Sequence, residues 1–306
     1  MLDDWLAQVI GTDRSWPSYR AMSWCDCLEI LSHCSLRFQY RVADWIAFVL
    51  RNTSNQVSRQ VRENIALCFS DLDKAGQKNL YRESIRQTCY AMTELAAVWC
   101  WPVEKVLARV TSLDVCEEFD RSTRGRIILA PHLGSWETLA IWLGKSSSAM
   151  MMYKRRKNKA VDSFIKDARA RSGGTLVPTK KHGLRKLLIG LREGDSLMIL
   201  PDQQPTRSKG RIEAEFFGVN APTTTLVQNL CKKVDCDVFL ASVRRSSPPG
   251  EFSLSIQPLE HERLATDAAS SAQYMNDQIE QLARQSLEQY QWGYRRFSKN
   301  AYASVK

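Results

Sequence analysis

Arg126-Ile-Ile-Leu-Ala130 is a short apolar run, and it continues through Pro131-His-Leu-Gly-Ser-Trp-Glu137 into Thr138-Leu-Ala-Ile-Trp-Leu143. The first run is typical of a buried strand, the second of a loop, and the third of a helix packed on one face. A strand that leads through a loop into a helix is the repeating unit of α/β proteins. This segment therefore predicts where the sheet of the protein begins.

The same alternation continues toward the carboxyl end of the chain. It predicts an α/β fold in which a central mixed sheet is flanked by helices. The expected strands are Ala149–Tyr153, Leu176–Val177, Ser196–Leu200, Val238–Arg244 and Phe252–Ile256, and the expected helices are Val161–Arg171, Leu184–Glu193, Thr223–Lys233 and Ala269–Tyr290.

The part before the first strand reads as helices. Apolar residues recur there at spacings of three and four, over Arg37–Leu50, Val57–Phe69 and Gln77–Trp101, with one or two more turns in Val103–Val110. We therefore expect two regions. A helical amino-terminal region, residues 1–110, is expected to associate with a membrane surface, and residues 111–306 are expected to form a single compact α/β catalytic unit.

Composition limits the class of protein. The chain has 306 residues, of which 44% are hydrophobic and 25% charged, so it can form a large core and is not a disordered protein. Its formal net charge of +10 favours an anionic partner. Nine scattered cysteines without a Cys-x-x-Cys pair predict reduced thiols and no metal site.

The sequence predicts no signal peptide and no transmembrane helix. The amino terminus lacks a basic region ahead of an apolar run. The apolar segment Val42–Leu50 is about half the length that spans a bilayer, and it contains Asp44. Any contact with a membrane is expected to occur from its surface.

His132 and Glu137 are the first candidate catalytic residues. A histidine in a loop can take a proton from a hydroxyl, and its second ring nitrogen needs an orienting acceptor such as a carboxylate. Gly134 is expected to let a substrate approach the backbone, and the start of the following helix offers amides to an oxyanion. The alternative is a structural histidine that binds a main-chain carbonyl.

Two further segments are candidate binding residues. Asp202 and Gln203 follow the strand that ends at Leu200, although an Asp before a Pro also commonly forms a turn. Residues 154–159 contain five basic residues, among them Lys154, Arg155 and Arg156, which form either a solvated face or a surface for phosphate or an acidic carrier protein. No nucleic-acid recognition motif accompanies them, so nucleic acid is not an expected partner.

Several segments in one order resemble the late acyltransferases of lipid A biosynthesis, the bacterial lauroyl and myristoyl transferase family. That family belongs to the wider glycerolipid acyltransferases, which share a His-x-x-x-x-Asp/Glu motif. The resemblance covers residues 35–298 and rests on His132 with Glu137 and on Arg62-Glu-Asn-Ile-Ala-Leu-Cys-Phe69, Arg169-Ala-Arg-Ser-Gly-Gly174, Gly183-Leu-Arg185, Leu200-Pro-Asp-Gln203, Phe216-Phe-Gly218, Thr223 and Gln289-Tyr-Gln-Trp-Gly-Tyr-Arg-Arg-Phe297.

The resemblance implies a glycerolipid acyltransferase-like fold and the roles of the candidate residues. His132 would be the general base and Glu137 its partner, while Arg169 and Asp202 would be polar residues of the same site. The base would activate a hydroxyl of a lipid A precursor or related glycolipid, which attacks the thioester of an acyl carrier protein. Neither a cofactor nor a metal is implied. The expected location is the cytoplasmic face of the bacterial inner membrane, with peripheral or weak anchoring to its anionic surface.

Two departures from the family pattern leave the acceptor open. The family usually begins with an apolar anchoring helix, whereas the equivalent region here carries Asp26, Glu29 and Asp44 and predicts an amphipathic surface helix. The approach to Phe216, residues 203–215, is also unusually charged. A lysophospholipid or another lipid is an alternative acceptor, and a silent lipid- or carrier-binding homologue is an alternative function.

Overall fold

The structure is a computed structural model that describes residues 24–156, 158–179, 181–205, 210–246 and 249–303. Three sequence-based expectations fall partly outside these ranges. They concern the amino terminus, Lys157 of the basic run, and residues 206–209 of the charged approach to Phe216.

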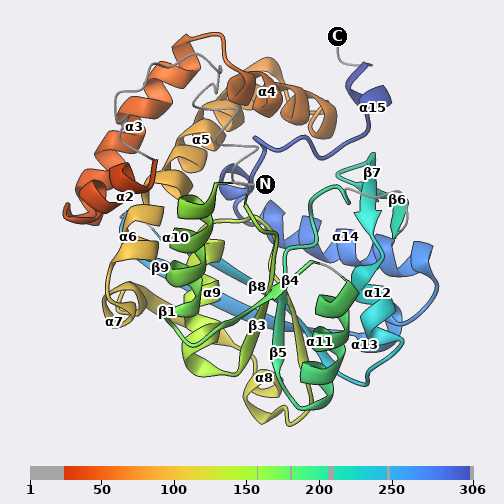
Figure 1. Ribbon diagram of the computed structural model, residues 1–306. Coiled ribbons are helices and arrows are strands. Elements are labelled where there is room, and N and C mark those ends of the chain that lie inside the picture. Colours follow the sequence, from red (N-terminus) through yellow and green to blue (C-terminus); the bar gives the residue numbers. More distant parts are fainter. Residues whose placement is uncertain (1–23, 157, 180, 206–209, 247–248, 304–306) are drawn as a thin grey trace.

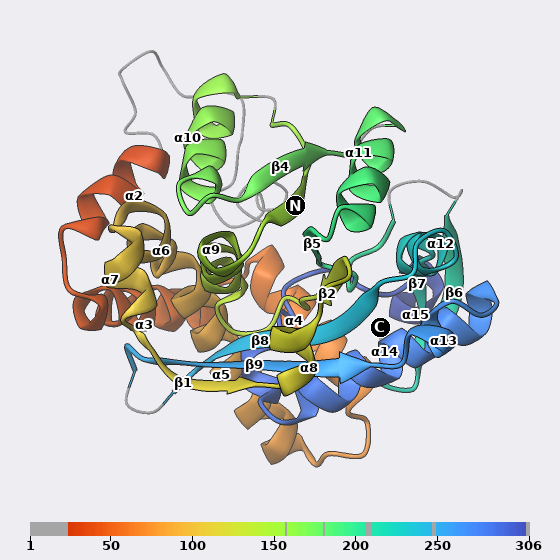
Figure 2. The ribbon, with the colours of Figure 1, turned by 90° about the horizontal axis from the view of Figure 1, so that it is seen from below.

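Seven strands form one mixed sheet in the order β1-β9-β8-β2-β5-β3-β4. Strands β8 and β9 are antiparallel, and every other neighbouring pair is parallel. This confirms the central mixed sheet, with β2 at its centre (Figures 1 and 2). The strands are β1 (Val110–Val115), β2 (Arg126–Leu129), β3 (Ala149–Tyr153), β4 (Thr175–Pro178), β5 (Ser196–Ile199), β8 (Asp237–Arg245) and β9 (Phe252–Leu259).

The amino-terminal region is helical, as predicted. In α3, for example, the Ser35 side chain caps the first turn by accepting from the amide of Phe38. The long helix expected over Gln77–Trp101 is interrupted at Glu94. The elements are α2 (Trp24–Ser32), α3 (Leu36–Asn52), α4 (Gln56–Cys68), α5 (Lys74–Thr93), α6 (Leu95–Cys100) and α7 (Val103–Leu107).

Several of the remaining helices pack against strands of the sheet. Helix α9 contacts β8 and β3, and α11 contacts β4 and β5. These later elements are α8 (Glu117–Arg121), α9 (Trp136–Ser146), α10 (Lys159–Ala170), α11 (Lys181–Arg192), α12 (Leu226–Cys231), α13 (His261–Leu264), α14 (Ala268–Arg284), the 3-10 turn η1 (Leu287–Gln289) and α15 (Lys299–Ala303).

A separate hairpin corrects one prediction. Strands β6 (Arg211–Phe216) and β7 (Val219–Thr224) pair with each other and not with the main sheet. The helix expected from Thr223 was therefore placed too early, because Thr223 pairs with Ile212 and α12 begins only at Leu226. Phe217 and Gly218 form the turn between the strands, both with positive φ, 51° and 71°.

Helices α3–α5 lie beyond one end of the strands, opposite α8 (Figure 1). This is the end where His132 follows β2, because Asn64 of α4 and His132 line one small cavity. Among the described residues, no helix combines the length and the apolar character that crossing a membrane requires.

Candidate active site

Two loops meet at the centre of the sheet. Strands β2 and β5 are parallel neighbours in which Leu129 pairs with Ile199. His132 and Asp202 each lie three residues beyond this pair, so the sheet brings them to the same edge. Crevices outside the carboxyl ends of such strands are the usual ligand sites of open α/β sheets.

Asp202 holds His132 with both carboxylate oxygens. Its Oδ1 lies 2.8 Å from His132 Nδ1, and its Oδ2 accepts from the His132 amide at 2.8 Å. Both side chains are buried, with 9% and 2% of their surface exposed. Burial alone raises the pKa of Asp202, but the adjacent His132 outweighs it and lowers this pKa below its usual value. Asp202 is therefore an ionised carboxylate that fixes the orientation of the imidazole.

The other ring nitrogen of His132 faces Gln203. His132 Nε2 and Gln203 Nε2 are 3.0 Å apart. With a proton on Nδ1 for Asp202, Nε2 carries a lone pair that accepts from the Gln203 amide. His132 and Gln203 both line a cavity beside the sheet, so the basic nitrogen lies where a substrate can enter.

Glu137 does not supply the carboxylate that orients His132, because other residues hold it. Arg169 of α10 binds both of its oxygens, with Nε donating to Oε2 at 3.0 Å and Nη2 donating to Oε1. Trp99 of α6 donates to Oε2 at 3.1 Å. Burial alone raises the pKa of Glu137, but Arg169 outweighs it and lowers this pKa. The five-residue spacing predicted that His132 pairs with Glu137. The structure instead has a Glu137–Arg169 ion pair beside the His132–Asp202 pair.

Gly134 gives the loop its shape. Its φ is +61°, and a Cβ there would lie 2.1 Å from the carbonyl oxygen of Val243 in β8. The residue is thus required for close packing of the loop on β8, and the expected role in admitting substrate is not needed to explain it. Within the described residues, the amides of Trp136 and Glu137 at the start of α9 have no backbone acceptor. They are the donors that a helix start offers to an anion.

A buried ion pair that was not predicted from the sequence supports this loop. Arg245 Nη2 donates to Glu94 Oε1 at 2.7 Å and to the carbonyl of Gly134 at 3.0 Å, and Arg245 Nε donates to Glu94 Oε2 at 2.8 Å. Tyr40 donates to the same carboxylate at 2.9 Å. The only sequence signal was a glutamate directly before the apolar run Leu95–Trp99.

Residues 289–297, here called the carboxy-terminal block, also hold the loop. The amide of Gln291 donates to the carbonyl of His132 at 2.9 Å. Asn64 of α4 donates to the carbonyls of Trp292 and Tyr294 at 2.6 and 2.8 Å and accepts from Tyr302 at 2.6 Å. Two segments on which the family resemblance rests thus meet beside His132.

The cavity beside His132 joins charged and apolar walls and has a volume of about 100 Å³. Lys154, Arg156 and Arg169 line it together with the catalytic candidates. Arg155 does not; it is exposed and lies 3.9 Å from Asp162. The apolar wall consists of Trp136, Ala140, Met151, Met152, Met198 and Leu200.

One group of possible metal ligands lies outside this cavity. The ligand atoms of Cys231, Cys236 and His261 lie within 4.8 Å of one another. A closed structural zinc site needs four ligands, and the described residues supply three. Cys-x-x-x-x-Cys spacing with a distant histidine gave no signal in the sequence.

Comparison with known proteins identifies the family. A model of the bacterial lipid A biosynthesis acyltransferases matches residues 23–299. The lipid A biosynthesis palmitoleoyltransferase of Escherichia coli K12 is 28% identical over 239 residues, which are 77% of each chain. The lipid A biosynthesis lauroyltransferase of the same strain is 22% identical over 78% of each chain. A lipid A biosynthesis acyltransferase of Haemophilus influenzae is 21% identical over 87% of this chain and 83% of its own. The chain is therefore an acyltransferase of the bacterial lipid A biosynthesis acyltransferase family.

Proposed function

We propose that this enzyme moves a fatty acyl chain from the thioester of an acyl carrier protein to a hydroxyl of a lipid A precursor. The observation that carries the proposal is the His132–Asp202 pair at the wall of a partly apolar, partly cationic cavity. The names of its relatives support an acceptor of the lipid A type.

In the proposed reaction, His132 is the general base. With its Nδ1 proton bound to Asp202, the imidazole accepts the hydroxyl proton on Nε2. The oxygen then attacks the thioester carbon, the new carbon–oxygen bond forms, and the carbon–sulfur bond breaks. The sulfur leaves as a thiol after it takes the proton back from His132. Ionised Asp202 stabilises the imidazolium that exists between these two proton transfers.

Gln203 is placed to position the acceptor in this scheme. Its amide donates to the lone pair of His132 Nε2. A substrate hydroxyl must replace that contact before it can lose its proton. The free amide group then lies next to the hydroxyl oxygen and can bind it.

Glu137 and Arg169 would act on the substrate through charge and position. Their ion pair closes one wall of the cavity, with side-chain exposures of 5% and 19%. The start of α9 adjoins it and presents the amides of Trp136 and Glu137, which suit the oxyanion of the tetrahedral intermediate. In this proposal Glu137 keeps Arg169 and the first turn of α9 in place, while Asp202 acts on His132.

The cavity walls fit the two substrates. Methionines adapt their shape readily, so Met151, Met152 and Met198 suit an acyl chain. Lys154 and Arg156 suit phosphate groups of the acceptor or acidic residues of the carrier protein. Both substrates would meet the enzyme at the cytoplasmic face of the inner membrane.

The test measures acyl transfer from carrier-bound fatty acids to a panel of lipid acceptors by purified protein. His132→Ala and Asp202→Asn should each lower kcat on the order of 10²–10⁴-fold, because the first removes the general base and the second removes the carboxylate that orients it. Lys232→Ala, at an exposed position, is the control.

Glu137→Gln separates the two possible carboxylate partners. If Asp202 orients the base, Asp202→Asn changes the acidic limb of the kcat profile against pH and Glu137→Gln leaves that limb in place. The reverse result would support the His132–Glu137 pairing. Transfer only to another lipid would keep the mechanism and change the acceptor, whereas folded protein without any transfer would refute the proposed function.

A further inference from the structure

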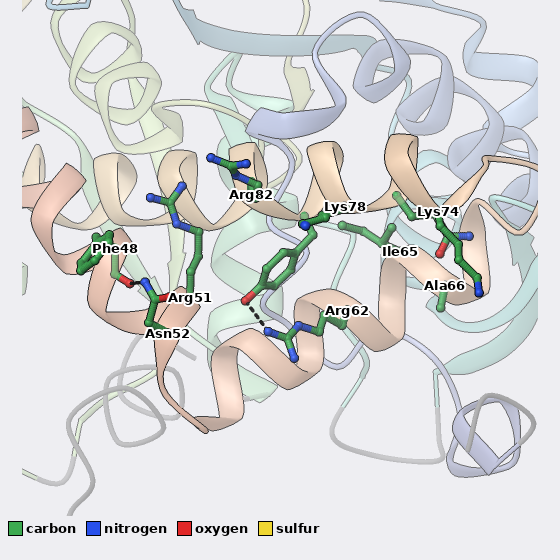
Figure 3. A pocket seen from close by; sticks show the side chains of 11 residues that line it. Phe48, Arg51, Asn52, Arg62, Ile65, Ala66, Lys74, Lys78 and Arg82 are labelled. Atoms are coloured by element: carbon green, nitrogen blue, oxygen red, sulfur yellow. Dashed lines mark hydrogen bonds between the residues drawn. The ribbon is translucent and has the colours of Figure 1, made fainter.

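A second, larger cavity lies among α3, α4 and α5, with a volume of about 650 Å³ (Figure 3). It is separate from the His132 cavity, with which it shares no lining residue. Five cationic side chains from the three helices line it, and none of the described residues that line it is acidic. They are Arg51, Arg62, Lys74, Lys78 and Arg82.

The described residues provide these five cations with no paired carboxylate. Within the described part of the chain, no carboxylate forms an ion pair with any of the five, and Arg62 instead donates to the Tyr81 hydroxyl at 3.1 Å. By contrast Arg86, one turn beyond Arg82 on α5, pairs with both Asp44 and Glu83. Lys74, Lys78 and Arg82 are spaced by four residues, so they share one face of α5 and repel one another. An anion bound there would relieve this repulsion.

An apolar stripe adjoins the cavity. Phe38, Trp45 and Phe48 of α3 have 47%, 68% and 60% of their surface exposed, and Phe48 also lines the cavity. Their spacings of seven and three place them on one side of the helix. The opposite side of α3 is buried through Tyr40, Ala43 and Ala47. Large exposed aromatics beside a basic surface are the features of an element that lies in a membrane interface.

We propose that this cavity binds the phosphate-bearing head group of an anionic bilayer lipid while Phe38, Trp45 and Phe48 enter the interface. Charge complementarity selects an anion, and the adjoining aromatic stripe favours a lipid surface over an acidic protein. This inference deepens the proposed function, because it describes how the enzyme reaches a membrane-borne acceptor. Its test does not depend on acyl transfer.

The test measures sedimentation of the full chain with vesicles of phosphatidylglycerol and phosphatidylcholine, and with vesicles of phosphatidylcholine alone. The wild-type protein should bind the anionic vesicles preferentially. Lys78→Glu combined with Arg82→Glu should weaken this binding at least ~10-fold, since each cation near an anionic surface strengthens attachment. Lys232→Glu combined with Lys233→Glu changes the net charge equally at exposed positions outside the cavity, and it should have little effect.

The role of the exposed aromatic residues of α3 is tested with one variant and a matched control. Trp45→Ala should weaken binding to the anionic vesicles, whereas Leu113→Ala, which removes a side chain 60% exposed on β1, should not. Equal losses in the paired charge variants would overturn the proposal, because binding would then follow net charge alone. Unchanged binding by Lys78→Glu with Arg82→Glu would also overturn it. So would binding of purified acyl carrier protein that depends on Lys78 and Arg82 while vesicle binding does not.

Acyl transfer to detergent-solubilised acceptor separates this inference from the proposed function. Lys78→Glu with Arg82→Glu should transfer at the wild-type rate there, because the membrane is absent. If the wild-type protein binds the anionic vesicles but transfers no acyl chain, the proposed function is refuted and the head-group site is still supported.

Discussion

Removing Arg245 should destabilise the enzyme more than removing any exposed arginine. Arg245 and Glu94 have side-chain exposures of 3% and 2%, and Arg245→Met would leave the Glu94 carboxylate buried without its cation. Loss of one partner of such a pair costs about 3–5 kcal/mol of unfolding free energy, because the remaining charge is neither hydrated nor neutralised. The Tyr40 hydroxyl would remain as a single neutral donor to Glu94.

Urea unfolding followed by tryptophan fluorescence measures this loss. The control is Arg121→Met, which removes an exposed pair with Glu117 whose side chains are 78% and 75% exposed, and it should cost only ~0.3–0.5 kcal/mol. Replacing both buried partners, as in Arg245→Met with Glu94→Leu, should cost less than the two single changes added together.

Either of two results would refute this reasoning. One is a loss below about 1 kcal/mol for Arg245→Met, the range of a surface pair. The other is strict additivity of the two single changes in the double variant. A fall of kcat in Arg245→Met at temperatures where it is folded is also expected, because Arg245 holds the carbonyl of Gly134 in the His132 loop.

Three more predictions concern the same region. Gly134→Ala should lower kcat on the order of 10²-fold, because the added Cβ would lie 2.1 Å from the carbonyl oxygen of Val243 and must displace the loop. The control is Gly218→Ala, which also has a positive φ but no atom within 4 Å of the added Cβ, and it should leave kcat unchanged. Asn64→Asp should lower the free energy of unfolding in urea by about 1–3 kcal/mol, because it removes the amide that donates to two main-chain carbonyls. An unfolding free energy equal to that of the wild-type protein would contradict that role. Folding lowers the pKa values of Asp202 and Glu137. Their contribution to stability is therefore present above the unfolded pKa of about 4 and is lost as pH falls through the lower folded values. In this acidic range the unfolding free energy of Asp202→Asn should depend less on pH than that of the wild-type protein.

Strands that are buried along most of their length could be predicted from the sequence. Strands β2, β5 and β8 are runs of apolar residues, and both β2 and β5 are buried at nearly every position. Strand β1, Val110–Val115, was missed because it lies at the sheet edge and four of its six residues are exposed. The hairpin strand β6, Arg211–Phe216, was not predicted, although its polar and apolar residues alternate as in a half-buried strand.

The structure brings most of the candidate site residues to one cavity, but their pairings differ from those that the sequence predicted. Sequence spacing put Glu137 next to His132, whereas the structure gives His132 a carboxylate 70 residues away in the chain. That contact depends on β2 and β5 being neighbours, which strand order decides and spacing along the chain does not reveal. The same holds for Arg245 and Glu94, 151 residues apart.

The bonds between the His132 loop and the carboxy-terminal block have a consequence for biosynthesis. Gly134 donates to the carbonyl of Gln289, and His132 accepts from the amide of Gln291. A ribosome makes these partners more than 150 residues after the loop, since the chain is synthesised from its amino end. The nascent chain therefore cannot hold the His132 loop in its mature geometry until Gln289 and Gln291 have been synthesised and can reach it.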